Sequence, residues 1–212
     1  MVEIALRISG EQYLREARAL IYTTEPITFG TSINVLLITD RLQEYAEGLK
    51  EYFEHSTNIT VDLVNNYDEA KHVILEKPID FLIMVGHLAN VRNYGVMDIC
   101  KCVNKYSGIV LFTSIDDFIR TLCEKYGIED IYDKTMSIEG IRYYLEWLYM
   151  GGVEKLIRDY KKEKGYDDLI DMFNNPPDNG LDFLNKISEA VKPIREQLRK
   201  EALEEIRRDT NI

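Results

Sequence analysis

The ends of the predicted strands carry several residues that bear directly on chemistry. These ends present Asp40, Val85, Gly86, His87, Thr113, Ser114 and Lys134, each at or just after the end of a predicted strand. In a parallel sheet such ends lie at one edge, where ligands bind. Phosphoryl transfer there would require a nucleophilic carboxylate and a cation. Val85 has no nucleophilic atom, and Asp40 alone is a poor Mg²⁺ site because that ion requires several oxygen ligands.

Other reactive residues do not form a recognisable site. His87 follows the third predicted strand, but no Cys, His or Asp lies at metal-ligand spacing from it. Cys100, Cys102 and Cys123 lack the paired spacing of a zinc site and are typical of buried thiols in a reducing compartment. Phosphate-binding glycine loops and hydrolase motifs are absent from the sequence. We therefore predict no enzymatic activity, no cofactor and no metal.

Alternating strands and helices would position the strand-end residues. Strands are predicted at Ile33–Thr39, Ile59–Val64, Asp80–Val85, Gly108–Thr113 and Ile128–Tyr132. The first of these is a continuous apolar run, which is typical of a strand buried on both faces of a parallel sheet. Helices are predicted between and after the strands, at Arg41–Glu54, Asp68–Glu76, Val96–Tyr106, Ser114–Tyr126 and Ile138–Met150. This order predicts the α/β class, with a five-stranded, doubly wound parallel sheet.

Two further regions flank this predicted sheet. Before it, the alternation in Met1–Ser9 predicts a strand, and Glu11–Tyr22 has the apolar spacing of a helix. After it, Gly151-Gly152 is predicted to end the preceding helix, and Leu181–Arg208 predicts a long amphipathic helix interrupted by Pro193, which can kink a helix. We therefore divide the chain into an N-terminal extension (1–32), an α/β domain (33–150) and a helical C-terminal region (151–212).

The order of elements and the strand-end residues resemble the receiver domains of response regulators over about half of the chain. In that family two acids end the first strand and hold Mg²⁺, and the aspartate that accepts the phosphoryl group ends the third strand. Here only Asp40 of the acidic pair is present, and Val85 stands at the acceptor position. Thr113 matches the family's hydroxyl residue and Lys134 its lysine, although Thr135 replaces the usual proline. The resemblance implies a flavodoxin-like, receiver-type fold with a degenerate receiver site at Asp40, Val85, Thr113 and Lys134.

The residues that remain of this site also have ordinary structural explanations. Asp40 can cap the helix that follows it, since Asp is favoured at that position. Thr113 can be a β-branched residue at the end of a strand, and Lys134 can be a solvated surface lysine. Under either interpretation Val85 leaves the site without a nucleophile, so we predict no phosphorylation at the usual position.

The resemblance implies a function in signal transduction through protein–protein contact. The family signals through a face that includes the last helix of the domain. The corresponding helix here carries aromatic side chains, which are common at interfaces, at Tyr143, Tyr144, Trp147 and Tyr149. We expect a phosphorylation-independent pseudo-receiver, related to two-component systems, that binds a protein partner and can form a homodimer through its C-terminal helices. The alternative is an atypical response regulator that controls transcription through those helices.

Composition bears on the kind of partner and on location. The net charge of −11 opposes binding to nucleic acid, because phosphates attract clusters of Lys and Arg. The hydrophobic fraction of 45% is that of a chain able to form a core. The sequence contains no run of 18 apolar residues and no signal-peptide pattern at the N-terminus. We therefore predict a cytoplasmic protein with no membrane contact.

Overall fold

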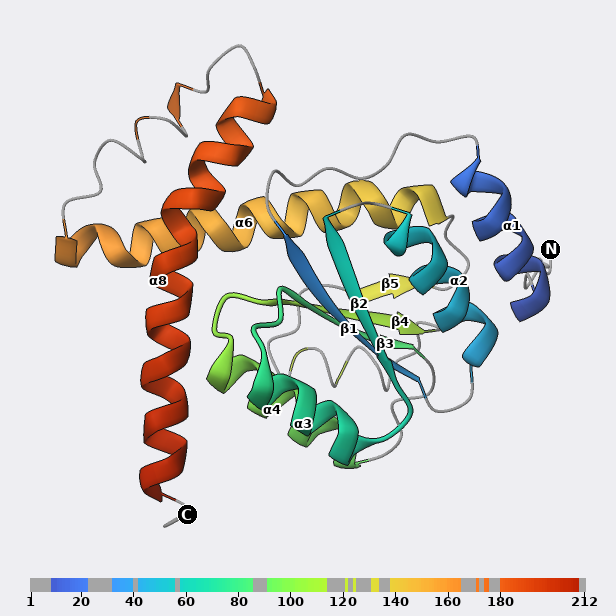
Figure 1. Ribbon diagram of the computed structural model, residues 1–212, viewed down its shortest axis with the longest axis horizontal. Helices are drawn as coiled ribbons and strands as arrows, with labels where there is room; N and C mark the ends of the chain where they lie inside the picture. Colours follow the sequence, from blue (N-terminus) through green and yellow to red (C-terminus); the bar gives the residue numbers. More distant parts are fainter. Residues whose placement is uncertain are drawn as a thin grey trace.

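The computed structural model describes most of the chain. It covers residues 9–22, 32–39, 42–55, 58–85, 91–113, 131–133, 138–164 and 180–209, together with Thr121, Glu124, Asp171, Asn174 and Asn175. Within these ranges a central sheet is covered by helices on both faces (Figure 1). Most of the predicted strand at Met1–Ser9 and most of the predicted helix at Ser114–Tyr126 lie outside the described residues.

The described strands form one parallel sheet in the order β2-β1-β3-β4-β5. Their bounds are β1 Ile33–Thr39, β2 Ile59–Val64, β3 Phe81–Val85, β4 Gly108–Thr113 and β5 Ile131–Asp133. The α/β class with a parallel sheet is therefore confirmed, and β1, β2 and β4 have the predicted bounds. The last strand ends one residue later than predicted, at Asp133, where it pairs with Thr113 of β4.

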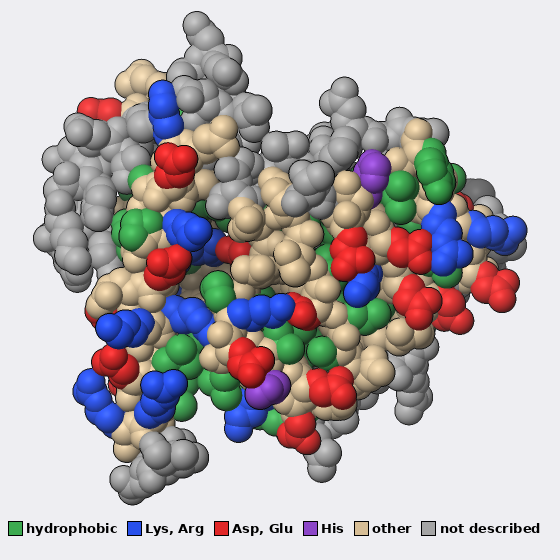
Figure 2. Space-filling view, viewed as in Figure 1, with side chains coloured by type: hydrophobic (Ala, Val, Ile, Leu, Met, Phe, Trp, Pro, Cys, Tyr) green, Lys and Arg blue, Asp and Glu red, His purple; other side chains and the backbone are tan. Residues whose placement is uncertain are grey.

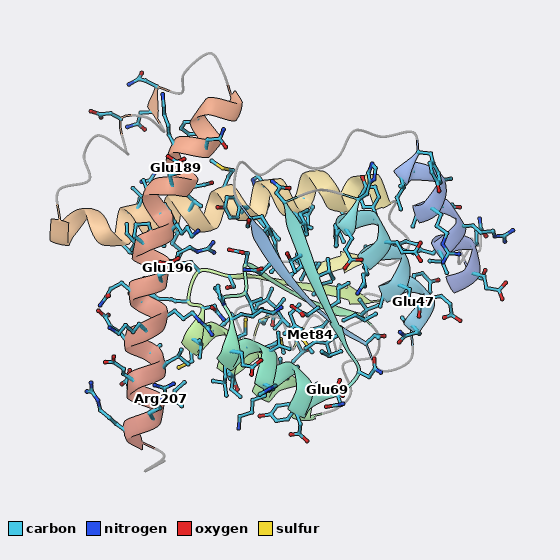
Figure 3. All side chains as sticks on the ribbon, viewed as in Figure 1. Glu47, Glu69, Met84, Glu189, Glu196 and Arg207 are labelled. Carbon is cyan, nitrogen blue, oxygen red and sulfur yellow. The ribbon has the colours of Figure 1, made fainter. Side chains whose placement is uncertain are left out.

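Six helices are described in full. Their bounds are α1 Gly10–Ile21, α2 Gln43–Glu54, α3 Tyr67–Glu76, α4 Val91–Val103, α6 Ile138–Lys164 and α8 Gly180–Asp209. Side chains of successive strand residues point to opposite faces of a sheet, and this alternation builds two cores. Leu37 and Ile83 pack in one core with α1, α2, α6 and α8. Leu36 and Met84 pack in the other, and Figure 3 shows Met84 between the sheet and helices α3 and α4.

The N-terminal helix α1 packs on α2 and extends the first core. Ser9 caps α1, its hydroxyl accepting a hydrogen bond from the Gln12 amide at 3.2 Å. Tyr13 and Ala17 are buried against α2. A Cβ atom at Gly48 of α2 would lie 3.1 Å from the Tyr13 ring, so the absence of a side chain there permits the close approach of the two helices.

Two of the predicted helix boundaries are wrong, and each lies beside a glycine. Helix α4 begins at Val91 and not at Val96, and it includes Gly95, where the Tyr67 ring lies 3.1 Å from the position of a Cβ atom. The predicted end of the last helix at Gly151-Gly152 is wrong, because α6 continues to Lys164. A Cβ atom at Gly152 would be 2.9 Å from the Tyr106 carbonyl oxygen. Gly95 and Gly152 therefore serve close packing, and the boundary placed after Met150 falls inside one helix.

The long C-terminal helix α8 lies against both layers of the fold. It includes Pro193, and Figure 1 shows that the helix changes direction along its length. Ile187 and Val191 are buried in the core shared with α6. Further along, Leu203 and Ile206 pack against the core shared with α3 and α4. The apolar stripe that the sequence showed in this helix is therefore used for packing within the chain.

Candidate functional site

The strand order reverses between β1 and β3, and the predicted site lies at their carboxyl ends. Thr39 and Val85 are neighbours across these two strands, at the point where ligands bind in open α/β sheets. Val85 is only 3% exposed and packs in the core beside α2 and α6. Thr39 is also buried, and its hydroxyl accepts a hydrogen bond from the Leu42 amide at 3.2 Å. One buried aliphatic group and one hydroxyl that is hydrogen-bonded to the segment leading into α2 therefore occupy this edge.

The other residues of the degenerate receiver site are described in part or not at all. Asp40, Lys134 and the nearby His87 lie outside the described residues. Thr113 ends β4 and is paired with Asp133 of β5, but its side chain is not among those described. The sheet register therefore brings Thr39 and Val85 together at this edge, and the positions of the predicted acid and lysine stay predictions.

The aromatic residues of the predicted interaction face divide between surface and core. Trp147 is 67% exposed, and its ring stacks on Tyr144 with centroids 6.2 Å apart. Tyr149 is only 5% exposed, and its hydroxyl shares a hydrogen bond of 3.2 Å with Ser188 of α8. The helical repeat turns Tyr149 inward and Trp147 outward, while Tyr144 is partly buried and packs against the core. The side chain of Tyr143 lies outside the described residues.

The opposite, amino edge of the sheet holds a polar cluster that sequence reasoning missed. Asp80, just before β3, accepts a hydrogen bond from the Asn34 amide at 2.8 Å and forms an ion pair with Arg195 of α8. Arg195 also donates to the Tyr106 carbonyl at 3.2 Å, and its guanidinium lies over the Tyr149 ring, 5.7 Å from the centroid. Both charged side chains are largely buried, so this cluster fixes α8 against the start of three strands.

A second arginine, one turn further along α8, is more deeply buried. Arg199 is 8% exposed and donates to the carbonyl oxygens of Ile74 at 2.8 Å and Leu75 at 3.0 Å. These carbonyls belong to the last turn of α3, where helix carbonyls lack partners and favour a cation. Arg199 also donates to the Asn104 side-chain oxygen at 3.0 Å. Burial lowers the pKa of Arg199, and within the described part of the chain no carboxylate pairs with it.

A pocket of about 290 Å³ opens beside this cluster, between α8 and the amino edge of the sheet. Apolar atoms of Val191, Leu198 and Tyr149 line part of it. Four basic and two acidic side chains also line it, namely Lys105, Lys192, Arg195, Arg199, Asp80 and Glu196. Lys and Arg side chains gather along α8 in the view of Figure 2. Glu196 lies in the middle part of that helix, between Glu189 and Arg207 (Figure 3).

A signal for this cluster was present in the sequence. Two arginines, Arg195 and Arg199, stand four residues apart and next to the apolar stripe of α8, and Asp80 directly precedes a buried strand. Residues four apart share a helix face, so the pattern places two cations beside the buried stripe. What the pattern lacks is the position of their partners, which come from distant segments.

The comparisons with known proteins identify no family. No protein-family model matches the chain, and a search of curated proteins finds no significant match. Among the helices that the structure describes, none is long and apolar enough to span a membrane. Within the same residues, no three His, Cys, Asp or Glu side chains are grouped so as to hold a metal ion.

Proposed function

We propose that this chain is a phosphorylation-independent regulatory module of the pseudo-receiver type, which acts by binding a protein partner. The observation that carries the proposal is the buried aliphatic side chain of Val85 at the carboxyl end of β3. An aspartyl phosphate would require a nucleophilic carboxylate at that position. The sheet order β2-β1-β3-β4-β5 supports the flavodoxin-like, receiver-type assignment, because it is the order of that class of doubly wound sheet.

The exposed Trp147 on α6, which stacks on the partly buried Tyr144, supports a function in binding. Large exposed hydrophobic side chains within the described residues are Trp147 and Tyr22, the latter 88% exposed at the end of α1. Trp147 differs from Tyr22 in being held by a stacked neighbour, Tyr144. Aromatic side chains that are held in place lose little conformational freedom on binding, and they often contribute most of the binding energy of an interface.

The alternative, control of transcription through the C-terminal helices, has less support. Arg195 and Arg199 point inward and bind groups of the chain itself. Arg208 lies 3.7 Å from Glu204 one turn away. Arg195 and Arg208 therefore have acidic partners, and Arg199 is buried. The net charge of −11 also opposes the approach of DNA.

The absence of phosphorylation is tested by incubation with acetyl phosphate and Mg²⁺, followed by intact mass measurement. A competent receiver protein treated in parallel serves as the positive control. We expect no phosphorylated species of this chain, because Val85 offers no nucleophile. A stable adduct on any residue would sink the pseudo-receiver proposal.

The binding function is tested by comparing partner capture by the wild-type chain and by Trp147→Ala. The matched control is Tyr22→Ala, which removes an equally exposed aromatic side chain at a distant helix end. We expect Trp147→Ala to lose the captured partner, Tyr22→Ala to retain it, and acetyl phosphate to have no effect on either. Equal capture by both variants would exclude the α6 face as the binding surface.

A further inference from the structure

The amino-edge pocket contains a buried positive charge that no acid neutralises within the described residues. Arg199 is bound by two carbonyl oxygens and one amide oxygen, all formally neutral. Arg195, by contrast, has a carboxylate partner in Asp80. Removing a charge from water costs free energy unless it is paired and fully hydrogen-bonded. The site around Arg199 is therefore one where a bound anion would be stabilised.

The charged side chains that line the pocket are, taken together, also net positive. With four basic and two acidic side chains, the pocket has a net charge of +2 in a chain whose net charge is −11. Lys192 is exposed at the pocket, and no ion pair involves it among the described residues. Asn104 also lines the pocket, and its side-chain oxygen accepts a hydrogen bond from Arg199. The pocket thus offers donors and positive charge.

The size and the apolar wall limit the ligand to a small molecule. A volume of about 290 Å³ is close to the lower end of the roughly 300–1,000 Å³ range of small-molecule pockets. Val191, Leu198 and the Tyr149 ring provide an apolar surface beside the cations, which would favour a ligand with an apolar body over a bare inorganic ion.

We infer that this pocket binds a small organic anion, with one carboxylate or phosphate group directed to Arg199 and Lys192 and an apolar body against Val191 and Leu198. The site lies at the amino edge of the sheet, whereas Val85 ends β3 at the carboxyl edge. Tyr149 of α6 lines the pocket from the buried side of that helix, and Trp147 is exposed. The inference does not rest on the proposed function, because anion binding here and partner binding at α6 can each occur without the other.

The test uses two probe anions and a neutral molecule of similar shape. Benzoate and phenyl phosphate are titrated into the full chain by calorimetry, with amide chemical shifts in nuclear magnetic resonance spectra to locate the site. Benzyl alcohol provides the apolar body without the charge, and inorganic phosphate provides the charge without the body. We expect at least one aromatic anion to bind more tightly than both controls and to shift the amides of Asn104 and Lys105.

Substitutions test whether the proposed cations bind the anion. Arg199→Met is expected to weaken anion binding about tenfold or more, because the substitution removes one charge-assisted hydrogen bond to the anion. Lys192→Gln is expected to weaken it severalfold, and its exposed position leaves folding intact. Lys200→Gln, which removes an exposed cation of α8 that does not line the pocket, is the matched control and should bind as the wild type does.

Three results of these experiments would decide against the inference. Absence of binding by both aromatic anions, or equal binding of benzyl alcohol, would overturn the inference. Unchanged affinity in Lys192→Gln together with unchanged affinity in a folded Arg199→Met would also overturn it. If Arg199→Met does not fold, the comparison of Lys192→Gln with Lys200→Gln decides the question alone.

Discussion

Asp80 and Arg195 are 115 positions apart in the sequence and form an ion pair at the amino edge of the sheet. The other oxygen of the Asp80 carboxylate accepts a hydrogen bond from the Asn34 amide, so one side chain connects β1, the start of β3 and α8. Arg195 extends this connection to the Tyr106 carbonyl just before β4. The C-terminal helix is thereby fixed to the sheet by charged groups as well as by its apolar stripe.

Removal of either partner of this pair should destabilise the protein. We expect Asp80→Asn and Arg195→Met each to lower the free energy of unfolding by about 2 kcal/mol, because each leaves a partly buried charge without its partner. Chemical denaturation of the two single variants and the double variant measures the coupling. The double variant should lose less than the sum of the single losses. Arg207→Met, an exposed change on the same helix, is the control; strictly additive losses would show that the pair contributes nothing.

The two adjacent glycines of α6 should respond to alanine in opposite directions. Gly151 is exposed, and a Cβ atom there would have no neighbouring atom within 4 Å, whereas a Cβ atom at Gly152 would be 2.9 Å from the Tyr106 carbonyl oxygen. We expect Gly151→Ala to stabilise the protein by about 0.5–1 kcal/mol, since alanine loses less backbone entropy in a helix. Gly152→Ala should destabilise it by about 1–3 kcal/mol through overpacking. Thermal unfolding measures both, and shifts of the same sign would contradict a continuous α6.

The two cysteines of α4 should differ in reactivity. Cys100 is fully buried, and burial raises the pKa of its thiol to about 12, whereas Cys102 is exposed. At mildly alkaline pH the thiolate fraction of Cys100 should be about three orders of magnitude below that of an ordinary thiol. Iodoacetamide with peptide mapping should therefore modify Cys102 in the native protein and Cys100 only after denaturation. Labelling of both residues at similar native rates would contradict the burial of Cys100.

The ion pair between α1 and α2 should give a small dependence of stability on pH. Arg18 donates two hydrogen bonds of 2.7 Å to Glu51, and this contact lowers the pKa of Glu51 below its usual 4.5. A carboxyl group with a lowered pKa in the folded state stabilises it above the unfolded pKa, and this contribution is lost as the pH falls below that value. Glu51→Gln should therefore be slightly less stable than the wild type at neutral pH.

The difference between Glu51→Gln and the wild type should shrink as the pH falls below 4.5, which denaturation curves at several pH values can follow. The effect should be small because both side chains are well exposed. Glu47→Gln, one turn earlier on α2, is the control, since Glu47 acts on Arg18 only through weaker charge attraction. A difference that stays constant across the acid range would show that the pair does not couple to folding.

The amino-acid sequence by itself determined the α/β class and the bounds of most core elements. Buried runs such as Ile33–Thr39 are strands because both faces of a parallel sheet require apolar side chains, and this is a local property. The sequence also determined the loss of a nucleophile at Val85, since no fold can supply a carboxylate to a valine. Helix ends were harder to predict from the sequence, because a glycine such as Gly152 can mark either a turn or a close contact. Only its neighbour in the structure, Tyr106, shows which of the two applies.

Tertiary structure alone decided what the charged residues of α8 and the aromatic residues of α6 do. Periodicity placed Arg195 and Arg199 beside a buried stripe, but it did not identify Asp80 or the carbonyls at the end of α3 as their partners. Tyr149 and Trp147 are similar in sequence context, and packing by α8 buries one and leaves the other exposed. The physical reason is that secondary-structure patterns depend on neighbours within a few residues. A buried charge or ring is satisfied by whichever distant segment the fold brings beside it.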